Sequence, residues 1–230
     1  MKFFDIHSHF VYGMDDGAQT REEMEAMLDA AWKDGVVELV ATPHVMPGLR
    51  PFHEDRFQRH LEEARVYCRA HGYAMKLYSG AENLYTPAMV SHAKDQCLVT
   101  MGNSRYVLLE FPPQISYDEI VEAVSLLERS GYIPVLAHVE RYRALRGFQL
   151  HRLKERSSIL CQINCTSVID GGVLLERFQV RRWLCEKLID YIATDSHDCY
   201  RRPTRMTEAY ILLARRYGKE YAKRLMMSRR

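Results

Sequence analysis

Residues 5–10 read DIHSHF, with two histidines one residue apart close to the start of the chain. Successive side chains of an extended strand alternate between its faces, so Asp5, His7 and His9 would point in the same direction. The stretch fits a paired metal ligand, and it equally fits an ordinary strand that carries polar residues. The residues at the ends of the other predicted strands decide between these two interpretations, and they also indicate the fold.

Short β-type segments alternate with amphipathic helical segments along the chain. Seven strands are predicted, at residues 3–9, 36–44, 74–82, 105–111, 133–139, 159–165 and 191–197. Helices lie between them, including one that begins at a capping box of Ser116 and Glu119, and two more at about 172–188 and 203–227. The alternation predicts an α/β fold with a parallel sheet. Periodicity alone leaves open whether the sheet is open and doubly wound or closed into a barrel.

Length and composition are those of a single globular domain. The chain has 230 residues, 47% of them hydrophobic and 27% charged, which predicts one domain over residues 1–230. No apolar run approaches the roughly 18 residues of a membrane span, so we expect no integral membrane segment, and the start lacks the features of a signal peptide. Six cysteines without CxxC pairing favour reduced thiols and a cytoplasmic location.

The net charge of +2 is unevenly distributed. From Arg201 onward the chain carries ten Lys or Arg against two Asp or Glu, a local charge of +8, and the first 200 residues therefore carry −6. A basic helical segment from about residue 203 can attract an anionic membrane surface, although a solvated helix face is the simpler interpretation. We expect no nucleic-acid partner.

Ligand-type side chains close six of the seven predicted strands. The residues concerned are His7 and His9 on the first strand, His44, Glu82, Glu110 and His138 on the next four, and Asp195 and His197 on the seventh. A lone histidine at the end of a buried strand is usually part of the packing, but six such ends are not independent accidents. In a barrel of parallel strands all these ends meet at one rim, where catalytic residues lie.

Mixed His, Asp and Glu ligands suit divalent ions such as Mn²⁺, Fe²⁺ and Zn²⁺. Eight candidates exceed what one tetrahedral ion needs, and a bridging carboxylate such as Glu82 would allow two or three ions. Such clusters generate a hydroxide nucleophile and clamp the oxygens of an in-line displacement at phosphorus. Because so many ionisable groups are costly to bury unpaired, bound metal would also lower that cost. Asp5 is expected to support the ligands by hydrogen bonding.

Three further residues lie next to these strand ends. Asp16, in the glycine-containing loop after the first strand, is a candidate to complete a metal shell and ranks above Asp15; the alternative is an Asp-Gly turn with a helix cap. Arg141 and Arg202 follow two ligand-bearing strand ends. Guanidinium groups at that position are suited to hold phosphate oxygens, although a surface arginine is usually inert.

Cys199 and Arg205 match the C-x5-R spacing of thiol phosphatases. That mechanism needs a loop of backbone N–H groups around phosphate, normally rich in glycine. The intervening loop reads YRRPT, which has no glycine and contains Pro203, a residue without an N–H. We therefore reject thiol catalysis.

The motifs DIHSH, DDG, ATPH, GAE, LLEFP, AHVER and ATDSH occur in the order seen in the PHP superfamily (polymerase and histidinol phosphatase). Over residues 3 to about 215 the chain resembles the bacterial manganese-dependent tyrosine-protein phosphatases of the CpsB type, found with capsule and exopolysaccharide genes. The resemblance implies a single-domain, distorted (β/α)7 barrel of the PHP type. It also implies hydrolysis of phosphotyrosine by a metal-bound hydroxide, without a covalent enzyme intermediate.

Ligand sets, cofactors and partners follow from the same resemblance. One ion would be held by His7, His9, Glu82 and Asp195, a second by Glu82, Glu110 and His138, and a third by Asp16, His44 and His197. Arg141 and Arg202 match the family's phosphate-binding arginines. The cofactor would be two or three divalent ions, with manganese the first choice and iron or zinc the alternatives. The partner would be a tyrosine-phosphorylated protein, namely a membrane-associated bacterial tyrosine kinase. That partner implies a cytoplasmic protein that can lie at the inner face of the membrane, and a homo-oligomer is left open.

Three rival functions are weighed against this one. Another PHP phosphomonoesterase, such as a histidinol-phosphate phosphatase, would have a deep site for a small ester, whereas a shallow site accepts phosphopeptides. A barrel amidohydrolase typically needs a bridging lysine, and no Lys ends a predicted strand. A non-catalytic metal-binding module is disfavoured because every ligand position holds a usable residue.

Overall fold

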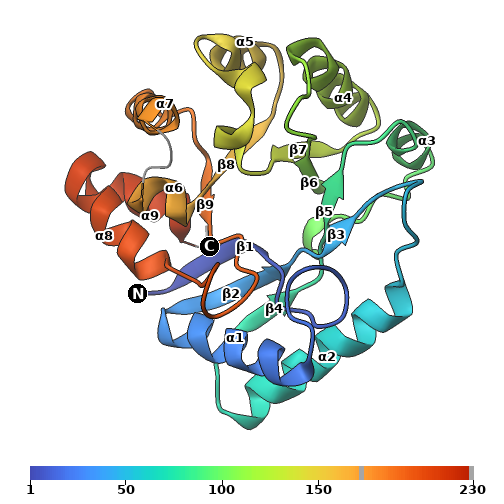
Figure 1. The fold of residues 1–230 in the computed structure, drawn as a ribbon, viewed down its shortest axis with the longest axis vertical. Helices are drawn as coiled ribbons and strands as arrows, with labels where there is room; N and C mark the ends of the chain where they lie inside the picture. The colour runs from blue at the N-terminus through green and yellow to red at the C-terminus, as the bar shows by residue number, and fades with distance from the viewer. Residues whose placement is uncertain (171–173, 228–230) are drawn as a thin grey trace.

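A computed structural model describes residues 1–170 and 174–227, in which nine strands and nine α-helices are found. The strands are β1 (Phe3–Ser8), β2 (Val36–Ala41), β3 (His44–Val45), β4 (Lys76–Tyr78), β5 (Glu82–Leu84), β6 (Tyr106–Glu110), β7 (Ile133–Leu136), β8 (Leu160–Asn164) and β9 (Tyr191–Ala193). The helices are α1 (Arg21–Lys33), α2 (Glu54–Ala70), α3 (Met89–Lys94), α4 (Tyr117–Arg129), α5 (Gln149–Arg156), α6 (Cys165–Ile169), α7 (Leu174–Cys185), α8 (Met206–Tyr217) and α9 (Lys219–Met226). The strands lie at the centre of the molecule and the helices form a ring around them (Figure 1).

Two of the predicted strands are interrupted. The predicted strand at 36–44 becomes β2 and β3, and the one at 74–82 becomes β4 and β5. Pro43 has no N–H for a strand ladder, which explains the first break. At the second break Gly80 passes close to β2, because a Cβ there would lie 2.8 Å from Val40 Cγ1 and 3.1 Å from the backbone oxygen of Ala41.

Every strand pair is parallel, in a three-stranded sheet of order β1-β2-β4 and a six-stranded sheet of order β3-β5-β6-β7-β8-β9. The two sheets are joined because the chain runs directly from β2 into β3 and from β4 into β5. The last strand returns to the first through a parallel bridge between Ser8 and Ser196. Hydrogen bonds from Asp195 N to His7 O (2.8 Å) and from His9 N to Ser196 O (2.9 Å) close this seam. The expected α/β fold of parallel strands is confirmed, and the bridge and these two bonds bring its last strand beside its first in a distorted barrel arrangement.

Two hydrophobic clusters stabilise the barrel. The larger one joins strands to the surrounding helices and includes the fully buried Trp183, Phe57 and Leu28. The smaller one consists of strand residues and the first residue after β7, namely Ile6, Val40, Leu108, Val135, Ala137 and Ala193. Burial of such side chains is worth about 1.5–3 kcal/mol each, so this cluster supplies stability directly beneath the polar rim.

The basic C-terminal segment forms two helices. α8 and α9 are separated at Gly218, whose φ of 93° is readily adopted only by glycine, so the predicted helix at about 203–227 is divided into two. Residues 172 and 173 of the predicted helix at 172–188 and residues 228–230 lie outside the described part of the chain. Among the described residues, no helix combines the length and apolar character that crossing a membrane requires.

Candidate metal centre

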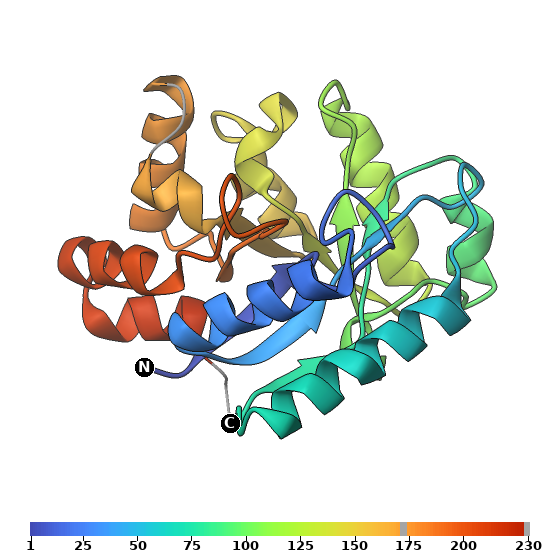
Figure 2. The same cartoon turned by 60° about the horizontal axis from the view of Figure 1, so that its bottom comes forward.

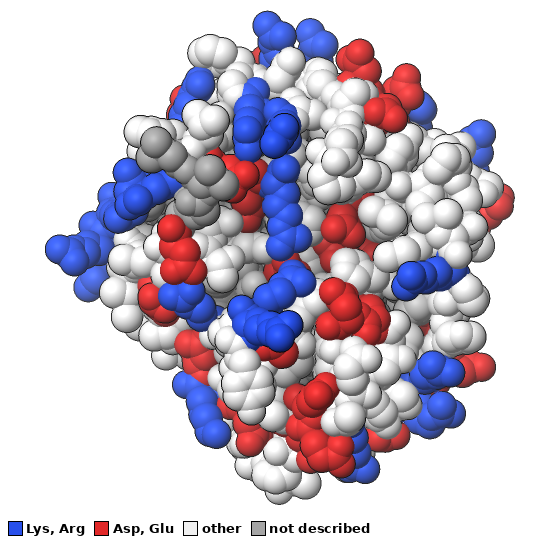
Figure 3. Space-filling view, in the orientation of Figure 1, with Lys and Arg blue, Asp and Glu red and all other residues white. Residues whose placement is uncertain are grey.

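The carboxyl ends of the strands carry the predicted ligands to one rim. Seen from this end, acidic and basic side chains lie next to one another around the middle of the face (Figure 3). The loop after β1 and the loop after β9 rise on the same side of the barrel (Figure 2). The first of these loops contains Asp16, and the second contains Asp195 and His197.

The ligand-type side chains form three groups, and within each group the ligand atoms lie within 4.8 Å of one another. The groups are His9, Asp16, His44 and His197; His7, His9, Glu82 and Asp195; and His44, Glu82 and Glu110. His138 adjoins the third group, with its Nε2 2.8 Å from Glu82 Oε1 and 3.7 Å from Glu110 Oε1. All nine predicted ligands therefore meet in one continuous cluster. The second group is identical to the first predicted ligand set. The first group contains the third predicted set, Asp16, His44 and His197, together with His9. The third group contains Glu82 and Glu110 of the second predicted set, with His44 in place of His138.

Several atoms of the cluster are buried without a hydrogen-bond partner among the described residues, including Glu82 Oε2, His44 Nδ1 and His197 Nε2. Glu82 Oε2 lies 3.1 Å from His44 Nδ1 and 3.2 Å from His7 Nε2. Buried polar atoms without partners are costly, and these converge on a common space. A divalent cation in that space would bond them all, so the residues present fit a metal.

Three histidines are held through the ring nitrogen that faces away from the other ligands. His9 Nδ1 lies 2.7 Å from Asp15 Oδ2. His7 Nδ1 lies 3.3 Å from Gln162 Oε1. His197 Nδ1 lies 3.0 Å from the backbone oxygen of Asp195. An acceptor at Nδ1 keeps the proton on that nitrogen and leaves the Nε2 lone pair for a metal. This arrangement is typical of metal-binding histidines.

The loop after β1 gives its two aspartates different positions. Asp16 Oδ1 lies 3.4 Å from His44 Nε2, within the cluster, which agrees with ranking it first. Asp15 instead binds His9 and accepts a hydrogen bond from the backbone N–H of His44 (2.8 Å). Gly17 permits this close loop, because a Cβ at that residue would lie 2.1 Å from the backbone oxygen of His9.

The one predicted strand without a ligand supplies supporting hydrogen bonds. On β8, Gln162 Oε1 accepts from the backbone N–H of His138 (2.7 Å), and Asn164 Nδ2 donates to Asp195 Oδ2 (2.8 Å). The two amides are joined by a bond from Gln162 Nε2 to Asn164 Oδ1 (2.8 Å). Sequence reasoning missed both residues, although two amides in the otherwise apolar strand ILCQINC were a usable signal.

β1 departs from regular alternation. Its register with β2 shifts between Asp5 and Ser8, as at a β-bulge. The side chain of Asp5 supports the site indirectly. It accepts hydrogen bonds from Thr194 N (3.0 Å) and Thr194 Oγ1 (2.6 Å), and Thr194 directly precedes Asp195. The expected hydrogen-bonding role of Asp5 holds, but it acts on the backbone before Asp195 and on the backbone N–H of His7 (3.3 Å).

Two cluster residues have strained backbones. His138 has φ 31° and Asp195 has φ 53°, in the left-handed region that non-glycine residues rarely adopt. Hydrogen bonds from their N–H groups to Gln162 and His7 hold these conformations. Strain of this kind is concentrated at functional sites, so the backbone points to the same rim as the ligands.

Arg141 and Arg202 both reach Asp195. Their Nη2 atoms lie 2.8 Å and 2.6 Å from Asp195 Oδ2. The two arginine side chains are 46% and 38% exposed, whereas that of Asp195 is 2% exposed. The guanidinium groups thus lie between the buried cluster and solvent, where an incoming anion would meet them first.

The pKa values of the cluster are set by burial and by the charges of neighbouring ligand residues. Burial acts to raise the pKa of Asp195, but His7 and His9 outweigh it and hold that pKa well below its usual range. Burial acts to lower the pKa of His9, but the carboxylates around it raise that pKa well above its usual range. Burial, with the nearby His9, lowers the pKa of His197 to about 4. Metal and protons therefore compete for the same nitrogens, and binding metal releases protons.

The rejected thiol mechanism finds no support in the geometry. Burial raises the pKa of Cys199, and the neighbouring Asp198 raises it further, so the thiolate is disfavoured. Arg205 is bound to Asp170 (2.6 Å) and Glu208 (2.9 Å). Neither half of the C-x5-R pattern is arranged for phosphate.

Fold and cluster together define the class of the protein, a (β/α)7 barrel with a histidine–carboxylate centre at the carboxyl ends of its strands. The family model described as capsular polysaccharide synthesis, CpsB/CapC, matches residues 3–229. Over 230 residues the chain is 31% identical to the tyrosine-protein phosphatase CpsB of Streptococcus agalactiae serotype V, covering 97% of this chain and 94% of that one. It is 32% identical to the CpsB of Streptococcus pneumoniae, again over 97% and 94% of the two chains.

A solved structure gives the same result. It comes from work on YwqE from Bacillus subtilis and CpsB from Streptococcus pneumoniae, described as unique metal-dependent tyrosine phosphatases, and matches with a TM-score of 0.86 at 25% identity. The match covers 96% of this chain and 90% of that one. The chain belongs to the CpsB/CapC family of capsular polysaccharide synthesis proteins, as its motifs predicted.

Proposed function

We propose that the protein is a metal-dependent protein-tyrosine phosphatase that binds two or three divalent ions at the rim of its barrel. The observation that carries this proposal is the convergence of nine histidine and carboxylate side chains, several of whose buried atoms have no hydrogen-bond partner in the part of the chain that the structure describes. Membership of the CpsB/CapC family supports the substrate class, because its relatives are named tyrosine-protein phosphatases.

The proposed ligand sets follow the predicted ones. They are His7, His9, Glu82 and Asp195; Glu82, Glu110 and His138; and Asp16, His44 and His197, with His9 and His44 near enough to serve a second ion each. Bound ions supply Lewis-acid stabilisation of the phosphoryl oxygens and lower the pKa of a water molecule. Manganese is the first candidate, with iron and zinc as alternatives that the ligand chemistry equally permits.

The chain's own residues bind and orient the substrate. Arg141 and Arg202 would exchange part of their contact with Asp195 for two phosphoryl oxygens, since guanidinium forks bind such oxygens in pairs. Asn164 donates to the same carboxylate oxygen of Asp195 and would hold it in place during that exchange. Asp15 keeps the proton of His9 on Nδ1, away from the ligand nitrogen.

The site is open enough for a protein substrate. Asp16 is 67% exposed, and the two arginines are more than one-third exposed. This shallow opening favours a phosphotyrosine on a polypeptide over histidinol phosphate. We further propose that the partner is a membrane-associated tyrosine kinase of capsule or exopolysaccharide synthesis. The proposed location is the cytoplasm, with peripheral binding at the inner face of the membrane, and the six free cysteines support a reducing compartment.

One assay tests the proposal. Phosphate release from an aryl phosphate, a phosphotyrosyl peptide and histidinol phosphate is measured with Mn²⁺, Fe²⁺ or Zn²⁺, and again with a chelator, after elemental analysis of the protein. We expect release from the first two substrates that the chelator abolishes. If the metal-loaded protein hydrolyses neither of them, the proposal is wrong. Preference for histidinol phosphate would assign the alternative function.

A further inference from the structure

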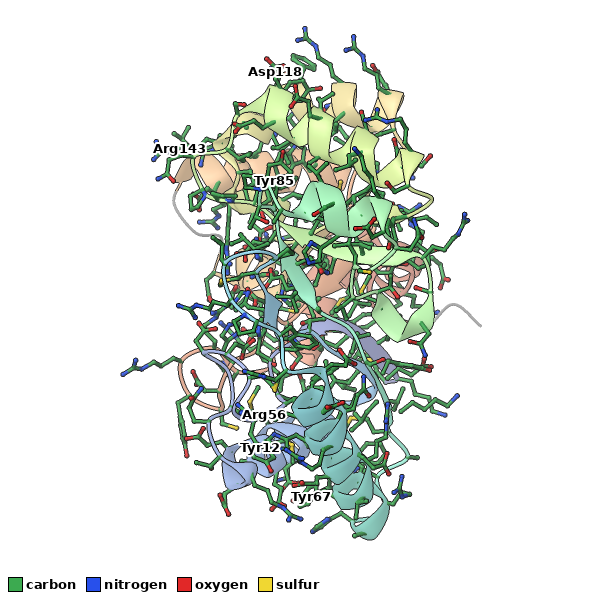
Figure 4. The ribbon with its side chains drawn as sticks, turned by 90° about the vertical axis from the view of Figure 1, so that its right-hand side faces the viewer. Tyr12, Arg56, Tyr67, Tyr85, Asp118 and Arg143 are labelled. Carbon is green, nitrogen blue, oxygen red and sulfur yellow. The ribbon has the colours of Figure 1, made fainter. Side chains whose placement is uncertain are left out.

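A pocket of about 810 Å³ lies directly beside the candidate metal centre. Asp16 and His44 form the wall that it shares with the cluster, and Arg50, Phe52 and Arg56 form the far wall. Figure 4 shows Arg56 at the beginning of α2, beside the loop that carries Tyr12. A substrate whose phosphate reaches the cluster therefore has a second cavity within reach of its neighbouring residues.

The two walls of the pocket differ in how their charges are matched. On the shared wall, Asp15 is bound to His9, and Asp16 lies close to His44. On the far wall, Arg50 and Arg56 are exposed, and neither has a carboxylate within 4.0 Å in residues 1–170 and 174–227.

Two other arginines of the same helix are paired, whereas Arg59, which does not line the pocket, also has no carboxylate within 4.0 Å among the described residues. Arg65 and Arg69 both bind Glu62, at 3.4 Å and 2.8 Å. The free positive charge of the pocket thus gathers next to the site and is matched by no described residue. An anion supplied by the substrate would provide the missing partner.

We propose that this pocket is a subsite for an anionic side chain close to the phosphotyrosine in the substrate polypeptide, a proposal that rests on the proposed function. The anion is either a carboxylate or the phosphate of a second phosphorylated residue, since guanidinium groups bind both. Phe52 adds an apolar surface for the carbon stem of that side chain. It packs on the buried Phe57 with ring centroids 5.5 Å apart, which keeps it in position.

Matched peptides test the subsite. The set contains a phosphotyrosyl peptide flanked by glutamates, the same peptide flanked by glutamines, one with a second phosphotyrosine, and a small aryl phosphate. The variants are Arg50→Gln, Arg56→Gln and the double variant. Arg59→Gln is the control, because Arg59 is an exposed arginine of α2 that does not line the pocket.

We expect the wild type to prefer the anionic peptides. Each pocket substitution should lower kcat/KM on them by about threefold to fivefold, with larger losses in the double variant. Activity on the glutamine peptide and the aryl phosphate should stay within about twofold. The anionic peptide that loses more activity identifies whether carboxylate or phosphate is the preferred occupant.

Two outcomes overturn the subsite. The first is an unchanged preference for anionic peptides in the double variant. The second is an equal loss in Arg59→Gln, which would indicate general attraction by the charge of α2. Both leave hydrolysis of the aryl phosphate and the neutral peptide intact, whereas failure of the proposed function abolishes these as well.

Discussion

The two ends of the barrel use the same strands for opposite purposes. At the carboxyl ends, nine ionisable side chains crowd together, and several of their buried atoms have no hydrogen-bond partner among the described residues. At the amino ends, a cavity of about 390 Å³ is lined mainly by apolar and aromatic residues, including Phe4, Val40, Tyr78 and Tyr106. The change is abrupt, since Ile6 belongs to the apolar cluster while His7, the next residue, belongs to the ionisable one. Function and stability are thus supplied by different ends of one sheet.

This division has an energetic reason. Burying unpaired charges opposes folding, so the rim needs an apolar layer beneath it that stabilises the strands independently of metal. The cluster of Ile6, Leu108 and Val135 provides that layer. Substitutions at the two ends should therefore separate loss of activity from loss of stability.

The largest expected effect is at the rim. His7→Ala removes a ring nitrogen 3.2 Å from Glu82 Oε2 and 3.4 Å from Asp195 Oδ1. We expect kcat/KM for metal-dependent phosphate release to fall by more than about a hundredfold, because loss of a residue that merely supports a ligand already costs 10–100-fold. Elemental analysis should show lost metal, while thermal unfolding of the chelated protein stays cooperative. His71→Ala, at an exposed histidine far from the ligand groups, is the control, and equal activities in the two variants would contradict the ligand role.

Much of this rim was predictable from the sequence. Ligand-type residues such as Glu110 and His138 follow apolar runs, and both signals are local. The supporting bonds of Gln162 and Asn164 depend on which strands become neighbours, so the two amides of this strand could mark a polar site without showing which ligands they hold. The breaks in the second and third strands were also missed, although Pro43 was a warning that period-2 alternation had to end.

The subsite beside the cluster illustrates the same limit. Arg50 and Arg56 stand in a loop and at a helix start, and nothing local connects them with Asp16. Only folding brings the loop after β1 against the segment before α2 to form the pocket. Sequence reasoning located the chemistry at strand ends, but not the surfaces that loops build around it.

The next effect concerns a charge buried below the rim. Burial raises the pKa of Asp5 to about 6 from 3.8, although bonds from Thr194 oppose the shift. Between pH 3.8 and about pH 6 the folded state therefore binds more protons than the unfolded state. The contribution of Asp5 to the free energy of unfolding is present below pH 3.8 and is lost as the pH rises through 6. Asp5→Asn should therefore raise the free energy of unfolding above pH 6, by up to about 3 kcal/mol.

Urea unfolding with a chelator, at several pH values from 4 to 8, measures this difference. Asparagine can still accept from Thr194 N through its carbonyl oxygen, so the seam between β1 and β9 should persist. The stability gain of Asp5→Asn should grow from pH 4 to pH 6 and then level off. A gain that is independent of pH, or a loss above pH 6, would show that the ionised carboxylate is stabilising there.

A smaller effect is expected at the opposite end of the barrel. Val40 is 2% exposed and belongs to the apolar cluster. Val40→Ala removes two methyl groups and enlarges the cavity, so the free energy of unfolding should fall by about 2 kcal/mol. The kcat/KM of the folded, metal-loaded enzyme should stay within about twofold. A large loss of activity at unchanged stability would show that the two ends do not divide the tasks.

The smallest expected effect separates two neighbouring arginines on the rim. Arg202 reaches Asp195 at 2.6 Å, whereas Arg201 forms no ion pair through its side chain within the described ranges. Arg202→Lys keeps the charge but loses the planar fork that can bind two oxygens at once, so we expect about a tenfold lower kcat/KM for an aryl phosphate. Arg201→Lys should change it by less than twofold. Equal losses in the two variants would mean that the rim attracts substrate by charge alone; a loss confined to Arg202→Lys would mean that the geometry fixed by Asp195 is what the phosphoryl group requires.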